Sequence, residues 1–170
     1  IMSSFDKTQG DINNLIFYTI DIKELNSIKN KFDIVCSFQV IEHFQDIEIF
    51  LENIKLLLSP DGIFICSTPN KLDASPKSDK PLNKFHVREY LWNEFEELLK
   101  IYFRGVNMFG LKRGGELNLY RRLKKIGLFN FLPDYINPVK RFYERIDCDN
   151  FIIVKNNLDT ALDFIAVCSK

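Results

Sequence analysis

The sequence predicts an α/β fold in which strands and amphipathic helices alternate along the chain. Two apolar runs, residues 31–38 and 63–67, show almost no polar alternation, which is typical of parallel strands covered on both faces. Between them, residues 47–58 repeat apolar side chains at helical spacing, and the turn sequence SPDG at 59–62 follows. A strand, a crossover helix and a second strand imply a parallel pair joined by a right-handed connection.

Further elements are expected on either side of this unit. Residues 15–20, LIFYTI, read as a short buried strand that ends at Asp21, and residues 31–38 take the middle of the sheet. Pro69 must end the strand at 63–67. Residues 91–102 form a second amphipathic helix, and residues 106–111 and 163–170 are strand-like, with the direction of the last strand left open.

Two segments differ in composition from the rest of the chain. Residues 70–84 are polar and long for a connection, so they form either a mobile lid or a surface insertion that the fold tolerates. Residues 112–150 contain nine Lys or Arg and five Asp or Glu, whereas residues 1–111 contain twelve and sixteen. We therefore expect a basic helical cap at about 112–150, inserted over the carboxyl edge of the sheet.

Composition restricts the class of protein. A chain of 170 residues with 46% hydrophobic content fits a single domain, residues 1–170, and 23 basic against 23 acidic residues disfavour nucleic acid as a partner. No apolar run approaches the ~20 residues that span a bilayer, and no secretory signal is visible, so a cytoplasmic protein is expected. The four cysteines show no CxxC spacing and are expected to be reduced core thiols: Cys36, Cys66, Cys148 and Cys168.

Three blocks stand out for their order and spacing: FDIVCSFQVIEHFQD at 32–46, LLLSPDGIFICSTPN at 56–70 and NKFHVREYLWNEFEELLKIYF at 83–103. Together they resemble class I, Rossmann-like methyltransferases that use S-adenosyl-L-methionine. The third block is similar to the branch that includes ubiquinone-type O-methyltransferases and small-molecule or saccharide methyltransferases. The resemblance implies S-adenosyl-L-methionine as the cofactor and a mostly parallel sheet whose last strand is antiparallel.

The glycine-rich turn of this family has no counterpart in the sequence. The family's first strand, that turn and an acidic residue should precede Leu15, and only fourteen residues do so. No G-x-G occurs in the chain, although such a turn lets the backbone approach the ligand closely. We therefore expect a partial sheet that lacks the first strands, either because the domain is incomplete at its amino end or because the turn has been lost.

Four residues at the ends of predicted strands are candidates for cofactor binding. The resemblance implies that Asp21 and Ile22 meet the adenine ring, although Asp21 is equally suited to cap the helical segment that follows it. Phe38 and Gln39 come directly after the central strand and are expected beside the methionine part of the cofactor. A plain core position is the alternative for Phe38.

Glu42, His43 and His86 are the candidate catalytic residues. An imidazole can accept the proton of a hydroxyl that is being methylated, and the adjacent Glu42 and His43 cannot both point fully into one cleft. The resemblance places the block around His86 over the acceptor, while a structural role stays open for both histidines. The ubiquinone-type branch binds a divalent metal with Glu-x-x-Glu-His; because Gln39 replaces the first of these ligands, we expect no metal.

Asn70, Tyr90, Arg121 and Arg122 are candidates for acceptor binding. Asn70 ends a strand at the ligand edge, Tyr90 can orient a hydroxyl, and the two arginines suit an anionic acceptor; a turn role for Asn70 and simple solvation of the arginines stay open. The expected function is methyl transfer to a small-molecule acceptor, anionic or saccharide-linked, at oxygen rather than nitrogen. A methyltransferase-like module that binds a partner without catalysis is the alternative.

Overall fold

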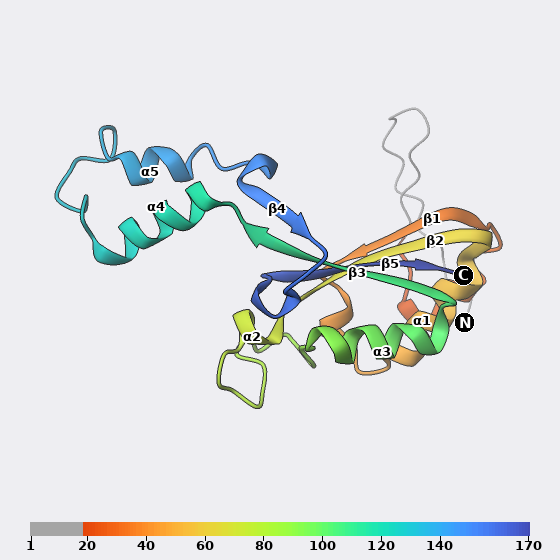
Figure 1. Ribbon diagram of the computed structural model, residues 1–170. Helices are drawn as coiled ribbons and strands as arrows, with labels where there is room; N and C mark the ends of the chain where they lie inside the picture. Colours follow the sequence, from red (N-terminus) through yellow and green to blue (C-terminus); the bar gives the residue numbers. More distant parts are fainter. Residues whose placement is uncertain (1–18) are drawn as a thin grey trace.

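The structure, a computed structural model, describes residues 19–170 as one sheet with helices against one face and a separate lobe at one end (Figure 1). The sheet has the strand order β1-β2-β5-β3-β4. Its strands are β1 (Phe32–Phe38), β2 (Leu58–Pro69), β3 (Gly105–Arg113), β4 (Phe151–Val154) and β5 (Asp163–Ser169). The strands expected at 63–67, 106–111 and 163–170 are therefore confirmed.

The pairing directions refine the expected sheet. β1 and β2 pair in parallel, whereas β5 pairs antiparallel with both β2 and β3, and β4 pairs antiparallel with β3. The α/β class and the antiparallel last strand are confirmed. The described sheet is mixed rather than mostly parallel, because β5 inserts between two strands, β2 and β3, that run in the same direction.

The helices lie largely where helical spacing predicts them. The α-helices are α1 (Ile47–Leu57), α2 (Lys71–Ala74), α3 (Trp92–Tyr102), α4 (Gly115–Ile126) and α5 (Pro138–Tyr143). The short 3-10 helices are η1 (Ile22–Ser27), η2 (Ile41–His43), η3 (Cys148–Asn150) and η4 (Leu158–Thr160). None of the helices within residues 19–170 has both the length and the apolar character needed to cross a membrane.

The SPDG sequence lies inside β2 rather than in a turn between two elements. The register with β1 moves from Phe32 opposite Leu58 to Ile34 opposite Ile63, so residues 59–62 form an irregularity in β2. Gly62 is needed there, since a Cβ at this position would lie 2.9 Å from the carbonyl oxygen of Phe32. Turn residues can therefore be accommodated within a strand when the partner strand leaves them unpaired.

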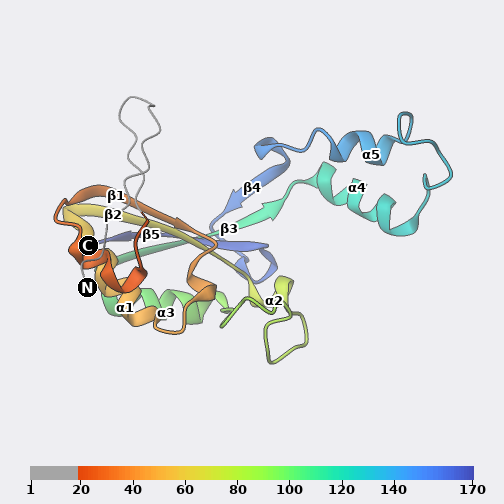
Figure 2. The same ribbon diagram turned by 180° about the vertical axis from the view of Figure 1, so that it is seen from behind.

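The core lies between the sheet and the helices α1 and α3 (Figures 1 and 2). The apolar stripes of the two helices face the sheet, where Phe64 and Phe164 are fully buried. Phe64 stacks on Phe103 with ring centroids 5.5 Å apart and meets Phe50 edge-on at 6.2 Å. This aromatic cluster fixes the two helices against one face of the sheet.

The expectation that residues 31–38 form a central strand covered on both faces is wrong for the described sheet. β1 is an edge strand, and Ile34 and Phe38 are 60% and 56% exposed. Ile34 and Phe38 lie on one face of the sheet, whereas α1 and α3, among the described elements, both lie on the opposite face (Figure 2). The predicted strand at 15–20 falls mostly outside the described residues; Thr19 and Ile20, which are described, have no regular structure.

Two of the four cysteines are buried and two are exposed. Cys66 and Cys168 are buried as expected, whereas Cys36 and Cys148 are exposed. Cys36 is exposed because it alternates with Ser37 and lies on the same uncovered face of β1 as Ile34 and Phe38. Burial raises the pKa of the Cys66 thiol well above its usual range, and a hydrogen bond with Cys168 adds to this effect.

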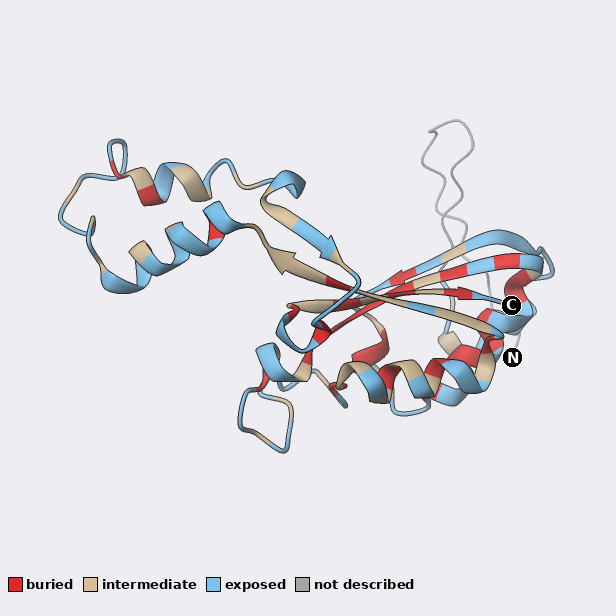
Figure 3. Ribbon diagram, in the orientation of Figure 1, coloured by how far each residue is buried: buried red, intermediate tan, exposed pale blue. Residues whose placement is uncertain are grey.

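Residues 112–150 contain helices, as predicted, but they do not lie over the sheet. α4 and α5 pack against each other in a lobe that β3 and β4 carry away from the sheet (Figure 1). The rings of Tyr120 and Phe142 stack with centroids 4.0 Å apart and hold the two helices together. Figure 3 shows most of this lobe exposed, and Figure 1 shows that it extends away from the carboxyl end of β3 instead of covering the sheet.

Candidate active site

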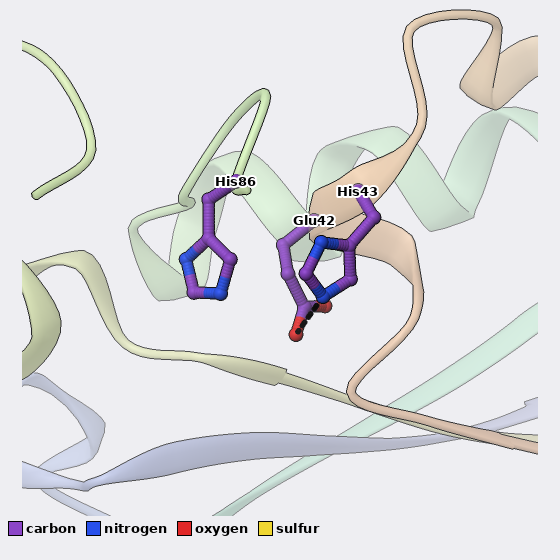
Figure 4. Close-up of side chains that lie close together, drawn as sticks. All are labelled: Glu42, His43 and His86. Carbon is purple, nitrogen blue, oxygen red and sulfur yellow. Dashed lines mark ion pairs between the residues drawn. The ribbon is translucent and has the colours of Figure 1, made fainter. Parts of the chain in front are cut away.

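Two of the sequence blocks meet at the carboxyl end of β1. η2 follows β1, and the backbone carbonyl of Glu42 accepts hydrogen bonds from the amides of Val87 at 2.7 Å and Arg88 at 3.2 Å. The segment before α3 is thereby fixed against η2. Glu42, His43 and His86 consequently converge, although His43 and His86 are 43 positions apart in the sequence (Figure 4).

His43 has one ring nitrogen bound and one free. Its Nδ1 lies 2.8 Å from the carbonyl oxygen of Phe85, which can only accept, so Nδ1 carries the proton in the neutral ring. Nε2 is then an acceptor, and the side chain is 40% exposed. The geometry suits a general base, because the ring orientation is fixed and the basic nitrogen remains available.

His86 is instead fully engaged within the fold. Its Nδ1 lies 2.7 Å from Oε1 of Glu89, and Nδ2 of Asn83 lies 2.9 Å from its Nε2. The amide of Phe85 donates to Oδ1 of Asn83, which turns the Asn83 Nδ2 toward the ring. With the side chain only 10% exposed, His86 is better suited to hold this segment in place than to accept a proton from an acceptor.

Two buried carboxylates lie beside the histidines. Oε2 of Glu42 accepts from the Thr68 hydroxyl at 3.3 Å, while Oε1 of Glu42 and Oε2 of Glu89 have no hydrogen-bond partner among the described residues. Oε1 of Glu42 lies 3.9 Å from Nε2 of His43. Ligand atoms of Glu42, His43 and His86 all lie within 4.8 Å of one another, although His86 would have to give up a hydrogen bond to ligate an ion.

The predicted cofactor-side residues lie in exposed or partly exposed positions. Phe38 ends β1, and Gln39 follows it with a backbone φ of 54°, an uncommon conformation that the amide of Gln39 maintains by donating to the Ser67 carbonyl. Asp21 caps η1 by accepting from the amide of Lys23 at 2.8 Å, as the alternative interpretation expected. Ile22 packs against the core.

Asn70 and Tyr90 are structural parts of this edge. Nδ2 of Asn70 donates to the carbonyls of Asp159 and Ala161, and its Oδ1 accepts from the amide of Leu72. Asn70 also forms a backbone bridge with Tyr90, and both side chains are buried. Burial raises the pKa of the Tyr90 hydroxyl, which keeps it protonated.

The two arginines proposed for acceptor binding lie apart from this cluster. Arg121 and Arg122 are exposed on α4, in the lobe, and Figure 1 shows α4 well away from α2 and α3. A cavity of about 510 Å³ also lies in the lobe, lined by Tyr120, Arg141, Phe142 and Arg145 together with acidic side chains. Neither feature adjoins the histidines.

Asp163 is a candidate functional residue that the sequence interpretation missed. It begins β5 opposite Pro69 and Leu111, so it lies at the same edge as the end of β2. Burial raises the pKa of its carboxyl group, and a hydrogen bond with Gln39 partly opposes this shift. The sequence does show an acidic residue directly before the terminal apolar run. This residue lies at the ligand edge only if the terminal strand is antiparallel.

Replacing Asp163 with Asn is expected to stabilise the fold at neutral pH. A carboxyl group with a raised pKa in the folded state contributes stability below its ordinary pKa, and this contribution is lost as the pH rises through the raised value. The melting temperature of Asp163→Asn should therefore exceed that of the parent at pH 7 and converge with it in acid. For a chain of this size each 1 kcal/mol appears as ~2–4 °C.

Asp61→Asn, at an exposed position, is the matched control and should change little at either pH. Arg113, which pairs with Asp73 at 3.4 Å, acts in the opposite direction by favouring the ionised carboxylate of Asp163. A lower melting temperature for Asp163→Asn at pH 7 would mean that this attraction stabilises the carboxylate by more than burial destabilises it.

Comparison with known proteins agrees with the sequence resemblance. A family model described as a methyltransferase domain matches residues 4–113. A probable S-adenosylmethionine-dependent methyltransferase of Mycolicibacterium smegmatis is 47% identical over 68 residues, which are 40% of this chain and 26% of that protein. The ubiquinone biosynthesis O-methyltransferase of Pelagibacter ubique is 34% identical over 56 residues, 33% of this chain and 23% of that protein. The chain thus spans about a quarter of the length of these curated relatives.

Solved structures agree on the fold. The crystal structure of a SAM-dependent methyltransferase from Archaeoglobus fulgidus superposes with a TM-score of 0.54 at 16% identity, covering 89% of this chain and 66% of that one. This similarity supports the Rossmann-like arrangement of the described strands.

Proposed function

This chain belongs to the methyltransferase-domain family, and on that premise we propose that it takes part in methyl transfer from S-adenosyl-L-methionine to a hydroxyl oxygen of a small-molecule acceptor. The observation that carries the proposal is the free Nε2 of His43 at the carboxyl end of β1, where open α/β sheets bind their ligands. A non-catalytic binding module would have no need of a basic nitrogen at this position.

His43 is proposed as the general base. The proton of the acceptor hydroxyl would pass to Nε2 of His43, while the hydrogen bond from Nδ1 to the Phe85 carbonyl keeps the ring in the correct tautomer. The resulting imidazolium lies 3.9 Å from Oε1 of Glu42, which has no other partner among the described residues. Glu42 thus stabilises the charge that develops on His43.

The exposed residues at the end of β1 fit part of a cofactor site. When bound, S-adenosyl-L-methionine supplies the electrophilic methyl group. Phe38 offers an exposed apolar ring, and Gln39 holds its left-handed backbone beside Ser67 at the same edge. Backbone strain of this kind is maintained only where the surroundings enforce it, which favours a functional role for Gln39.

Oxygen is favoured as the methylated atom for two reasons. A hydroxyl must lose its proton during transfer, so a positioned base accelerates the reaction. In addition, one relative is named an O-methyltransferase. We leave Arg121 and Arg122 out of this acceptor site, because α4 stands apart from the histidines (Figure 1).

The proposal can be tested with methyl-labelled S-adenosyl-L-methionine and a panel of phenols, sugars, carboxylic acids and amines, with mass spectrometry to locate the methyl group. We expect label on a hydroxyl oxygen, and little or none with His43→Gln. Label on an amine would contradict the choice of oxygen. Bound cofactor without transfer to any acceptor class would instead favour the non-catalytic module.

A further inference from the structure

The far end of the lobe combines basic and apolar side chains on an exposed surface. α4 ends at Gly127, whose φ of 73° turns the chain, and residues 128–137 lead back to α5. This connection is the part of the lobe most distant from the sheet (Figure 1), and Figure 3 shows it largely exposed. We call residues 121–136 the lobe tip.

The lobe tip is strongly positive. Between Glu116 and Asp134 the chain carries four basic side chains and no acidic one. The basic residues are Arg121, Arg122, Lys124 and Lys125, and none of them forms an ion pair with another described residue. Asp134, the nearest acid on the other side, is paired with Lys140. The positive charge is therefore not neutralised within the lobe.

Large apolar side chains stand beside these charges. Ile126 is 74% exposed, Phe131 and Tyr135 are each 78% exposed, and Leu128 is more than half exposed. Lys124 lies over the Tyr143 ring at 4.5 Å, but the basic groups have no ion-pair partner among the described residues. Single exposed apolar residues are ordinary, whereas four within ten residues beside such basic groups form an amphipathic surface. Such a surface suits the boundary between lipid headgroups and acyl chains, where basic groups meet phosphates and apolar groups insert.

We propose that the lobe tip docks the protein on an anionic membrane surface. Arg121, Arg122, Lys124 and Lys125 bind lipid phosphates, and Ile126, Leu128 and Phe131 insert beneath them. Leu111 lies near the end of β3, the strand that leads into the lobe, and it pairs with Asp163. Asp163 also pairs with Pro69 at the end of β2, so the lobe begins at the carboxyl edge of the sheet. Docking therefore directs the carboxyl edge of the sheet toward the bilayer.

Vesicle sedimentation tests the proposal with the chain itself. The chain should sediment with phosphatidylcholine vesicles that contain phosphatidylglycerol and remain in the supernatant with phosphatidylcholine alone. Arg121→Gln/Lys125→Gln should weaken binding roughly 10- to 30-fold, about fivefold for each charge removed. Leu128→Ser/Phe131→Ser should weaken it comparably, and added salt should act on the electrostatic part alone.

Matched controls remove similar groups elsewhere. Lys77→Gln/Lys80→Gln removes two exposed charges outside the lobe, and Leu82→Ser/Ile101→Ser removes two apolar side chains that are 66% and 72% exposed. Both controls should bind as the parent does. Because all of these side chains are exposed, circular dichroism should be unchanged. A Tyr135→Trp variant should also show a blue shift of its emission on the anionic vesicles.

Equal binding to both vesicle types would overturn the proposal, as would binding that the tip variants leave unchanged. A third contradictory result has two parts: the parent does not bind vesicles, and it forms a dimer in analytical ultracentrifugation that the Leu128→Ser/Phe131→Ser substitutions dissociate. That result would make the lobe tip a contact between copies of the chain.

Discussion

His43→Gln is expected to lower kcat/KM for methyl transfer by ~10²–10⁴-fold, the range for removal of a general base. Glutamine can still donate a hydrogen bond toward the Phe85 carbonyl, which His43 contacts at 2.8 Å, but it has no basic nitrogen. The change should lie mainly in kcat and leave KM nearly unchanged. Steady-state kinetics of the protein measure both parameters.

His86→Gln is the matched control for this prediction. Since both ring nitrogens of His86 are engaged by Glu89 and Asn83, its replacement should lower the melting temperature and reduce turnover less than the His43 change does. If His86→Gln abolished turnover while His43→Gln left it near normal, the roles of the two histidines would be reversed. Near-normal turnover in both folded variants would mean that His43 and His86 have only structural roles.

Phe64→Ala is expected to reduce the free energy of unfolding by ~3–5 kcal/mol, as for other buried aromatic side chains. Phe64 is fully buried and contacts the rings of Phe50 and Phe103, so its removal leaves a cavity between the sheet and both helices. Urea denaturation monitored by circular dichroism gives the value. The denaturant dependence should be unchanged if only stability is altered.

Phe38→Ala is the corresponding control on the edge strand. Its ring is 56% exposed, and substitutions at exposed positions usually change stability by less than ~0.5 kcal/mol. A loss comparable to that of Phe64→Ala would contradict the described exposure of β1. It would show that the sheet face opposite α1 and α3 is covered in solution.

Much of the fold could be predicted from apolar spacing. The helices at 47–58 and 91–102 and the strands at 63–67, 106–111 and 163–170 are present because each has a strong local pattern. The strand at 31–38 is present, but it lies at the edge of the described sheet and not in its middle. An apolar run indicates that both faces of a strand are apolar, but it does not indicate whether other elements pack on those faces. The direction of β5 was implied by the family resemblance and not by its own residues.

The site was predictable in its members but not in their roles. Sequence blocks pointed to Glu42, His43 and His86, and the structure brings them together. Which histidine keeps a free nitrogen depends on contacts with Phe85, Asn83 and Glu89, and no spacing rule reports these contacts. Asp163 was missed because its location at the ligand edge follows from a pairing between residues far apart in sequence.

The central location of β5 constrains the order in which the chain can fold during synthesis. β5 bonds to β2 along one side and to β3 along the other, so these two strands have no direct contact through which to associate. Until residues 163–169 have left the ribosome, β2 and β3 each lack the partner strand on one edge, although α3 contacts both α1 and β3. Such long-range pairing slows folding and exposes strand edges to other chains in the interval. The release of β5 from the ribosome therefore determines when the inner edges of β2 and β3 become paired.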